Sequence, residues 1–254
     1  MRQVIVKGAA VHTRGVEAGK DYAWHIKVGE MGLLDKIISF HRQVLRDIGG
    51  ETLRLLTLVE DKRVGFLIGD MPTSRADHGK RTIYDTLYLE LDEKYIPIIF
   101  KAVAILLLCT HDKYQQHEVP FVEYAEKLFE EGDNERFTSR LIKMPTAGKQ
   151  PDMDLDALIL GKWALYSNET NQARCARFLT DYAKHYINNF CFISTGRVSL
   201  EKCQLVAECV EECVLLTLSS EVKEDIDLNK KTLKQTLKLG KLSNLKGLMS
   251  GLKK

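Results

Sequence analysis

The sequence of 254 residues predicts an α+β protein with a small, mostly antiparallel sheet in its N-terminal half and a helical C-terminal half. Apolar and polar residues alternate in several segments before residue 92, as they do in strands that bury one face. After residue 95, apolar residues recur mostly at the spacing of amphipathic helices. A lysine-rich segment without acidic residues closes the chain and predicts a basic amphipathic C-terminal tail.

The N-terminal half is expected to contain strands and one helix. The strands are expected at residues 4–6, 22–28, 53–59, 64–68 and 82–91, and the helix at residues 33–48. Gly49 and Gly50 would end that helix, because glycine readily adopts the conformation found just past helix C-termini. In the strand at 82–91, Asp85 is a misfit, because the alternation places it on the apolar side.

The C-terminal half is expected to be mainly helical. Helices are expected at residues 96–109, 121–130, 136–143, 155–166, 172–187 and 200–216, with one short strand at residues 190–194. Pro97 fits the first turn of the first of these helices, where its missing N–H costs little. Ser199 is a favourable N-cap for the last one, because its hydroxyl can accept a bond from a free backbone N–H.

The domain boundaries follow from one irregular segment. Residues 144–154 contain two prolines, a glycine and no periodicity, so they are the expected linker. The chain would then comprise an α+β domain at 1–143, a mainly helical domain at 155–228 and the basic tail at 229–254.

Cysteine usage and hydropathy predict a cytoplasmic protein. The six cysteines include no CxxC pair, and the N-terminus has no secretory signal, which favours reduced thiols. The most apolar stretch, residues 96–109, is too short to span a bilayer and is interrupted by Lys101. We therefore expect no transmembrane segment.

Familiar catalytic motifs are missing from the sequence. It contains no phosphate-binding GxxxxGK[ST] loop, and no GxGxxG, HExxH or GxSxG pattern. Most nucleotide-dependent enzymes and hydrolases therefore lose support, and we expect no cofactor and no metal site. His12 and His25 fall on neighbouring predicted strands, where they could face each other across a hairpin.

The richest polar segment is residues 69–85, which lies between two predicted strands. Loops longer than a usual hairpin turn are often functional, and basic side chains there could hold a phosphate or a carboxylate. The expected binding residues in this segment are Arg75, Asp77, His78, Lys80 and Arg81. The alternative interpretation is a protruding, solvated loop without a partner.

The same region suggests a second hypothesis, a metal-dependent nuclease centre. Asp70, Asp85 and Glu90 are carboxylates near strand ends that could hold cations, and Lys94 could orient the attacking water. The residues around Glu90 give no clean acid-x-Lys pair, which weakens this hypothesis.

The C-terminal tail is the most specific feature. Residues 229–254 carry eight lysines and no acidic residue, and the leucines near the end fall on one face of a helix. Such helices bind anionic membrane surfaces, nucleic acid or grooves in partner proteins. The expected contact residues are Lys241, Leu242, Leu245, Lys246 and Leu248. Docking of this helix on the acidic body of the same chain is the alternative.

Residues 64–91 hold a PTxR turn and a tyrosine-rich strand, and this stretch resembles uncharacterised components of bacterial anti-phage defence cassettes. The resemblance covers about a tenth of the chain, implies a role in a multi-protein antiviral defence assembly and transfers no catalytic residue. Together these features favour a non-catalytic component that contacts protein partners through the 70–85 loop and the tail. The alternatives are a nuclease effector and a membrane-surface-associating protein, and the sequence does not decide whether the chain is an enzyme.

Overall fold

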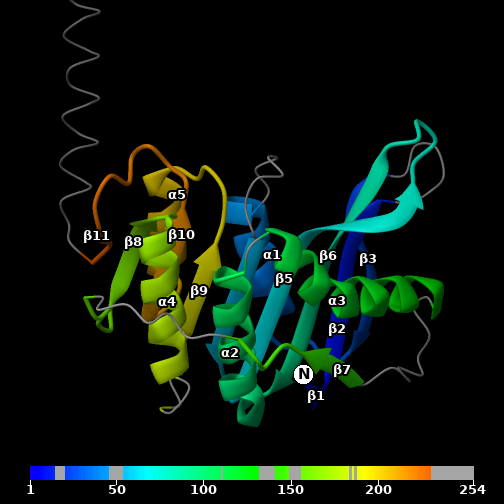
Figure 1. Ribbon diagram of the computed structural model, residues 1–254, viewed down its shortest axis with the longest axis horizontal. Coiled ribbons are helices and arrows are strands. Elements are labelled where there is room, and N and C mark those ends of the chain that lie inside the picture. Colours follow the sequence, from blue (N-terminus) through cyan, green and yellow to red (C-terminus); the bar gives the residue numbers. More distant parts are fainter. Residues whose placement is uncertain are drawn as a thin grey trace, which may run out of the picture.

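The computed structural model describes residues 1–14, 21–45, 54–109, 111–131, 141–148, 156–182, 185 and 188–229. These residues form an α+β protein in which helices cover both faces of one large, mostly antiparallel sheet (Figure 1). The fold class expected from the sequence is therefore confirmed. Residues 230–254 lie outside the described part, so nothing tests the predictions for Lys241, Leu242, Leu245, Lys246 and Leu248.

The sheet has nine strands among the described residues, in the order β11-β8-β10-β9-β4-β5-β6-β2-β3. In chain order the strands are β2 (Gly8–Arg14), β3 (Tyr22–Gly29), β4 (Arg54–Glu60), β5 (Arg63–Ala76), β6 (Thr82–Asp92), β8 (Lys162–Tyr166), β9 (Phe190–Ser194), β10 (Glu212–Thr217) and β11 (Ile226–Asp227). Pairing is antiparallel from β3 to β9, parallel from β9 through β10 to β8, and antiparallel again at β11. A separate antiparallel ribbon joins β1 (Arg2–Ile5) to β7 (Leu141–Met144).

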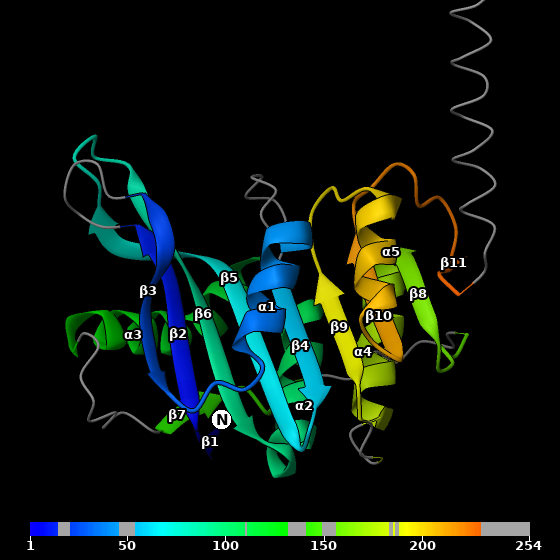
Figure 2. The same cartoon turned by 180° about the vertical axis from the view of Figure 1, so that it is seen from behind.

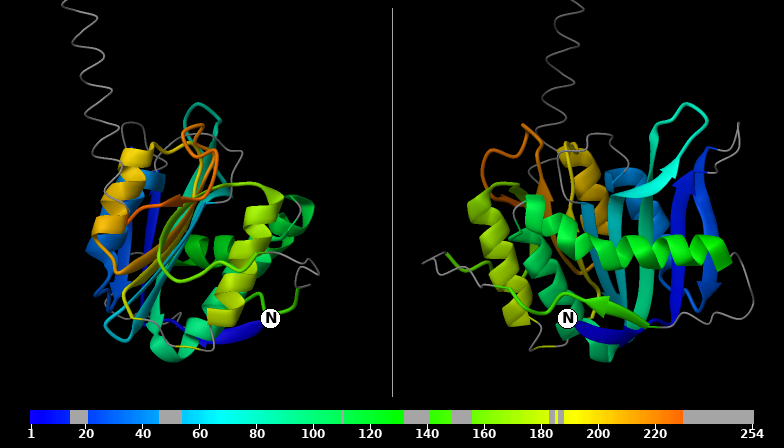
Figure 3. Two further views of the ribbon diagram at one scale, coloured as in Figure 1. Left: turned by 90° about the vertical axis from the view of Figure 1, so that its left-hand side faces the viewer. Right: turned by 45° about the vertical axis from the view of Figure 1, so that its right-hand side comes forward.

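Helices form a layer on each side of the sheet (Figures 2 and 3). One layer contains α2 (Ile96–Leu107), α3 (His111–Glu131) and α4 (Glu169–Tyr182). The other contains α1 (Leu34–Phe40), the π-helix η1 (His41–Leu45) and α5 (Leu200–Glu208). The short 3₁₀ helix η2 (Glu93–Tyr95) connects β6 to α2.

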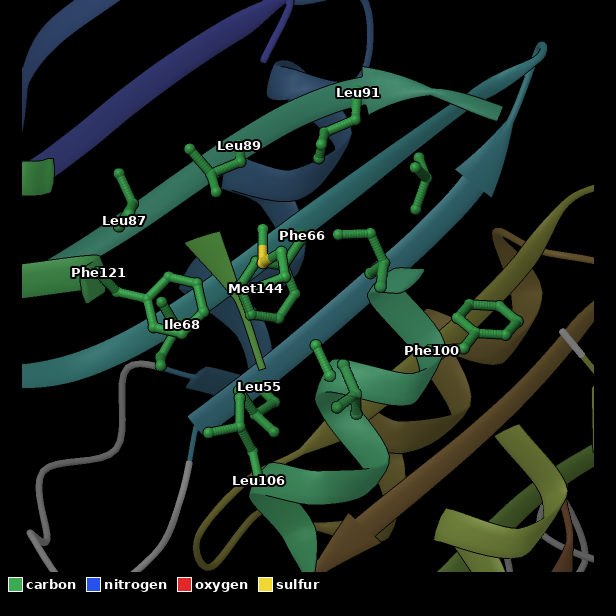
Figure 4. Packing of buried hydrophobic residues seen from close by; sticks show 14 of the residues in the cluster. Leu55, Phe66, Ile68, Leu87, Leu89, Leu91, Phe100, Leu106, Phe121 and Met144 are labelled. Atoms are coloured by element: carbon green, nitrogen blue, oxygen red, sulfur yellow. The ribbon is translucent and has the colours of Figure 1, made fainter. Parts of the chain in front are cut away.

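Each face of the sheet has its own apolar core, because side chains alternate between the faces along every strand. Along β4, Leu55 packs toward α2 and Leu56 packs toward α1. Figure 4 shows the first core, in which side chains of β4, β5 and β6 face Phe100 of α2, Phe121 of α3 and Met144 of β7. Burying each such side chain stabilises the fold by about 1.5–3 kcal/mol.

The sheet is larger than the small N-terminal sheet expected from the sequence, and it continues across the expected linker. β4 pairs with β9 from Leu55↔Ser194 to Val59↔Phe190. The first core likewise contains residues from both sides, such as Phe100 and Phe190. The predicted division into 1–143 and 155–228 therefore does not separate two sheets or two cores among the described residues, and the second region contributes β8, β9, β10 and β11 to the sheet besides its helices.

Three segments predicted as helix are strands instead. Residues 141–143 belong to β7, residues 162–166 form β8 and residues 212–216 lie in β10, while 156–161 are not helical. Short apolar runs in strands with both faces buried do not alternate, so their periodicity resembles that of a buried helix. By contrast, β9 matches its predicted range, and the Ser199 hydroxyl accepts from the Lys202 N–H as the expected cap of α5.

None of the helices in the described ranges is both long and apolar enough to cross a bilayer. The six cysteines all lie in the described ranges, and the structure joins none of them in a disulfide.

Candidate functional site

The polar segment 69–85 forms a hairpin that extends beyond the sheet, here called the arm (Figures 1 and 2). It is more ordered than the loop predicted from the sequence, because β5 continues to Ala76 and β6 begins at Thr82. The two strands stay paired through Met71↔Asp85, Pro72↔Tyr84 and Ala76↔Thr82, with irregular register between these pairs. Only a short turn remains at the tip.

Asp77 organises this turn. Its Oδ1 accepts the N–H groups of Gly79 at 2.8 Å and Arg81 at 3.0 Å. Its Oδ2 accepts from Arg81 Nε at 3.0 Å and from Arg14 Nη1 at 2.7 Å. The bonds from Arg81 and Gly79, the backbone N–H of Arg81 foremost, lower the pKa of Asp77 to about 2. Asp77 is therefore a structural residue of the arm, and it ties the tip to the end of β2.

A second buried carboxylate holds the base of the arm. Asp85, the misfit of the sequence pattern, is fully buried and receives Arg75 Nη2 at 2.6 and 2.7 Å and the Thr13 hydroxyl at 2.5 Å. Burial raises the pKa of Asp85, while Thr13 and Arg75 act in the opposite direction. The Arg75 guanidinium also lies 4.2 Å from the ring centre of Phe129 on α3. Arg75 is thus a support for the arm.

Helix α3 makes further contacts with the arm. Glu126 Oε1 accepts from the Ser74 N–H at 3.0 Å and from the Ser74 hydroxyl at 2.9 Å. Together with the Arg75–Phe129 contact, these bonds position the arm against a helix that the core already fixes through Phe121. The arm therefore projects from the sheet in one defined direction.

The charges left on the outside of the arm are basic. Asp77 and Asp85 are buried, whereas His78, Lys80 and Arg81 are exposed, and the Arg81 side chain is 70% exposed. Of the five binding residues predicted in this segment, these three are exposed at the tip, although Arg81 also pairs with Asp77. The other two, Arg75 and Asp77, are held inside the arm by ion pairs.

The carboxylates of the nuclease hypothesis are held separately. Asp70 forms a 2.8 Å ion pair with Arg54. Burial raises the pKa of Asp70, and the charge of Arg54 only partly offsets this rise. Asp85 faces α3 on one side of the sheet, as described above. Glu90 lies on the α1 side, where Gly32 N–H donates to Oε1 at 2.9 Å and Leu33 N–H to Oε2 at 3.0 Å.

Two further donors occupy Glu90, namely Arg63 Nη1 at 2.5 Å and the Tyr88 hydroxyl at 2.7 Å. Lys94 belongs to η2, and its Nζ lies 5.1 Å from the ring centre of Tyr95. Within the described ranges, no three His, Cys, Asp or Glu side chains are grouped so that they could hold a metal ion. The structure therefore does not bring the four nuclease candidates together.

A cluster of aromatic rings beside the arm was missed by sequence reasoning. The ring cluster consists of His12, Tyr22, Trp24 and His41. The His12 ring centre lies 5.8 Å from that of Tyr22, 5.3 Å from that of Trp24 and 4.8 Å from that of His41. Tyr22 is 40% exposed, His12 and Trp24 are half-buried, and His41 is buried.

Two backbone irregularities create this cluster. Between the pairs Val11↔Ile26 and His12↔Trp24, β3 has one extra residue, His25, so the expected pairing of His12 with His25 is wrong. This bulge turns Trp24 toward the α1 side, although Val28 further along β3 packs on the opposite face. On the other side, His41 begins the π-helix η1, and such segments frequently occur at functional sites.

A third irregularity lies in the same row of the sheet. Thr86 pairs with His12, and the register of β5 against β6 shifts between Ile68 and Met71, with Asp70 at a φ of 58°. Gly69 lies close to its neighbours at this point, since a Cβ atom on it would lie only 3.2 Å from the Arg54 Cβ and 3.4 Å from the Thr86 hydroxyl oxygen. The row from Trp24 to Arg54 therefore combines rings, a hydroxyl and an ion pair at the upper end of the sheet.

No sequence signal could have assembled the ring cluster, because its members come from separate segments and meet only through the bulge and the π-helix. Sequence similarity adds nothing to this geometry. No family model matches the chain, and no curated protein or solved structure is significantly similar to it.

Proposed function

We propose that this protein is a non-catalytic component of a multi-protein assembly and that it contacts an acidic surface of a partner protein through the tip of the arm. The observation that carries the proposal is the sorting of charge along the arm. Asp77 and Asp85 are buried and paired with arginines, whereas His78, Lys80 and most of the Arg81 side chain are exposed.

The way the arm is held supports this proposal. Two buried ion-pair groups and the contacts with α3 fix the hairpin before any partner arrives. A contact surface that is already ordered loses less conformational entropy on binding, so more of the interaction energy remains as affinity. Exposed basic groups then favour acidic partners and accelerate encounter with them.

The tail, the sequence resemblance and the cysteines extend this proposal. Residues 241–248 of the tail would supply a second contact, and the resemblance of residues 64–91 suggests a bacterial defence assembly. Free thiols fit a reducing cytoplasm. The described residues offer no grouping of acids that favours the nuclease alternative.

The test is co-purification of the chain with the proteins encoded beside its gene. We expect that Lys80→Glu together with Arg81→Glu abolishes capture of the partner, because the change reverses the charge of the tip. The matched control is Arg197→Glu with Lys223→Glu, which reverses two exposed charges on the other half of the molecule. Equal loss of capture in both variants, or in neither, would contradict a role for the arm.

A further inference from the structure

The ring cluster and the arm carry an inference that goes beyond partner binding by the arm tip. Tyr84 of the arm is 45% exposed, and its backbone N–H donates to the Tyr22 hydroxyl at 3.2 Å. This bond fixes the Tyr22 ring beside the backbone of Tyr84, and both tyrosine side chains stay partly exposed. Partly exposed rings follow one another from Tyr22 through His12 to Trp24, and Tyr84 adjoins the Tyr22 end through its backbone.

These rings are held in place without being buried. The bulge at His25 turns Tyr22 and Trp24 to the side where His41 and the π-helix support them. Bulges and π-helices both interrupt regular hydrogen bonding, and both occur preferentially where side chains must be re-aimed. Their meeting at one cluster indicates a surface arranged for contact with a planar ligand.

Positive charge lies at one end of these rings. Arg14 pairs in register with Tyr22 and donates to Asp77, which also binds Arg81 of the tip. The arm tip with Lys80 and Arg81 is therefore attached directly to the strand that carries Tyr22. Accessible aromatic faces beside a basic segment are the combination with which proteins bind unpaired nucleotides.

We propose that the ring cluster and Tyr84 form a stacking surface for the bases of single-stranded nucleic acid. In this arrangement Lys80 and Arg81 contact the phosphates. An acidic protein segment would match the charge of the tip but would leave the aromatic faces unused, so the rings favour nucleic acid. The inference does not depend on the proposed function, since it can hold for a protein with or without an acidic protein partner.

The main experiment measures the binding of a fluorescently labelled oligothymidylate of about 20 nucleotides to the full chain by anisotropy. We expect Tyr22→Ala with Tyr84→Ala to weaken binding at least about tenfold, because each stacked base contributes substantially to affinity. Tyr166→Ala is the matched control, because Tyr166 on β8 is similarly exposed, at 39%, but lies near the other edge of the sheet. Tyr22→Phe with Tyr84→Phe keeps the rings and should bind like the unaltered protein.

Charge is tested separately from stacking. Lys80→Gln with Arg81→Gln should reduce the slope of log affinity against log salt by about 1.4, at about 0.7 per lost phosphate contact. The control variant Arg197→Gln with Lys223→Gln should leave the slope unchanged. Because every variant keeps the lysine-rich tail, any contribution of the tail is the same throughout.

A second measurement does not rely on the alanine variants being folded. The chain has two tryptophans, so in a Trp163→Phe background the fluorescence reports Trp24 alone. Addition of the oligonucleotide should quench it, whereas polyglutamate should not.

Four results would overturn the proposal. These are an absence of oligonucleotide binding, equal affinity for a duplex of the same length, equal affinity of the tyrosine-to-alanine variant and the unaltered protein, and quenching of Trp24 by polyglutamate. The third result would show that the binding does not involve these rings, and the last would indicate a surface for acidic protein.

Discussion

At the scale of single residues, buried carboxylates determine what the exposed residues of the arm can do. The sequence presents Arg75 and Arg81 as similar basic residues of one polar segment. The structure separates them, because the Arg75 side chain is 16% exposed and pairs with the fully buried Asp85, whereas the Arg81 side chain is 70% exposed. Arg75 is fixed inside the arm, and Arg81 keeps most of its side chain exposed while it pairs with Asp77.

This difference gives a prediction for stability. Arg75→Ala should lower the free energy of unfolding by about 3 kcal/mol, because it leaves the buried charge of Asp85 without its partner. Arg81→Ala should lower it by no more than about 1 kcal/mol, because Asp77 keeps Arg14 and two backbone N–H groups as partners. Urea unfolding of both variants checks this. Equal stability of Arg75→Ala and the unaltered protein would show that Asp85 is satisfied without the arginine.

Glu118 on α3 gives a second prediction, which concerns pH. Its carboxyl group is buried, and burial raises its pKa from 4.5 to about 7. The folded state therefore binds this proton more tightly than the unfolded state does. The stability contributed by the protonated group is fully present below pH 4.5 and is lost as pH rises through 7.

Glu118→Gln removes this dependence, because the amide stays uncharged. Above pH 7 the variant should be more stable than the unaltered protein by up to about 3 kcal/mol, and near pH 4.5 the two should be equally stable. Urea unfolding at pH 5 and pH 8 measures the difference. A variant that is less stable at pH 8 would mean that ionised Glu118 has a favourable partner.

At the scale of elements, the sequence predicts what repeats along the chain and misses what depends on contacts between segments. α2 and β9 follow their predicted ranges, because a long apolar helix and an isolated apolar strand are distinctive. The sequence predicts helices at the positions of β8 and β10, because the apolar runs there do not alternate with polar residues. β2 begins with Gly8, Ala9 and Ala10, small residues that carry no strand signal.

The candidate site divides in the same way. Asp85 stood out in the alternation of its strand, so its burial could be foreseen, although the identity of its partners could not. The basic residues of the tip could be predicted from the composition of residues 69–85. The ring cluster was invisible, because the register of Trp24 against His12 depends on one extra residue in β3.

The register at the bulge can be tested. Deleting His25 should remove the bulge and leave Val11↔Ile26 and His12↔Trp24 as consecutive regular pairs, so Trp24 and Tyr22 should stay on the α1 side. The near-ultraviolet circular dichroism of the ring cluster should then be retained. His25→Ala keeps the extra residue and should retain the spectrum as well. Loss of the spectrum in the deletion variant would contradict the pairing of His12 with Trp24.

At the scale of the whole molecule, one sheet and two cores join residues from both ends of the described chain. Phe190 of β9 shows the connection, because it is fully buried and its ring centre lies 5.6 Å from that of Phe100 on α2 and 6.0 Å from those of Phe178 and Tyr182 on α4. The β4–β9 pairing crosses the same boundary with backbone hydrogen bonds. We therefore expect the described part to unfold in one cooperative step.

The two tryptophans allow this expectation to be tested, because Trp24 lies on β3 and Trp163 on β8, near opposite edges of the sheet. The variant Trp163→Phe reports the first region and Trp24→Phe the second. In each variant the urea midpoint from fluorescence should coincide with the midpoint from far-ultraviolet circular dichroism. Two separately folding domains would instead give different midpoints for the local and the global signal.

Phe190→Ala makes the test sharper. Removing this ring should cost about 3–5 kcal/mol, because it leaves a cavity between β9, α2 and α4. If the molecule unfolds cooperatively, the urea midpoints reported by the two tryptophans should fall together, even though β3 with Trp24 is several strands away from β9 and the cavity. Leu205→Ala, which truncates a side chain that is 44% exposed, is the control and should move neither midpoint appreciably. A fall in the Trp163 midpoint alone would support two separately folding domains divided at residues 144–154, since the effect of losing a core ring would then be confined to the region that contains β9.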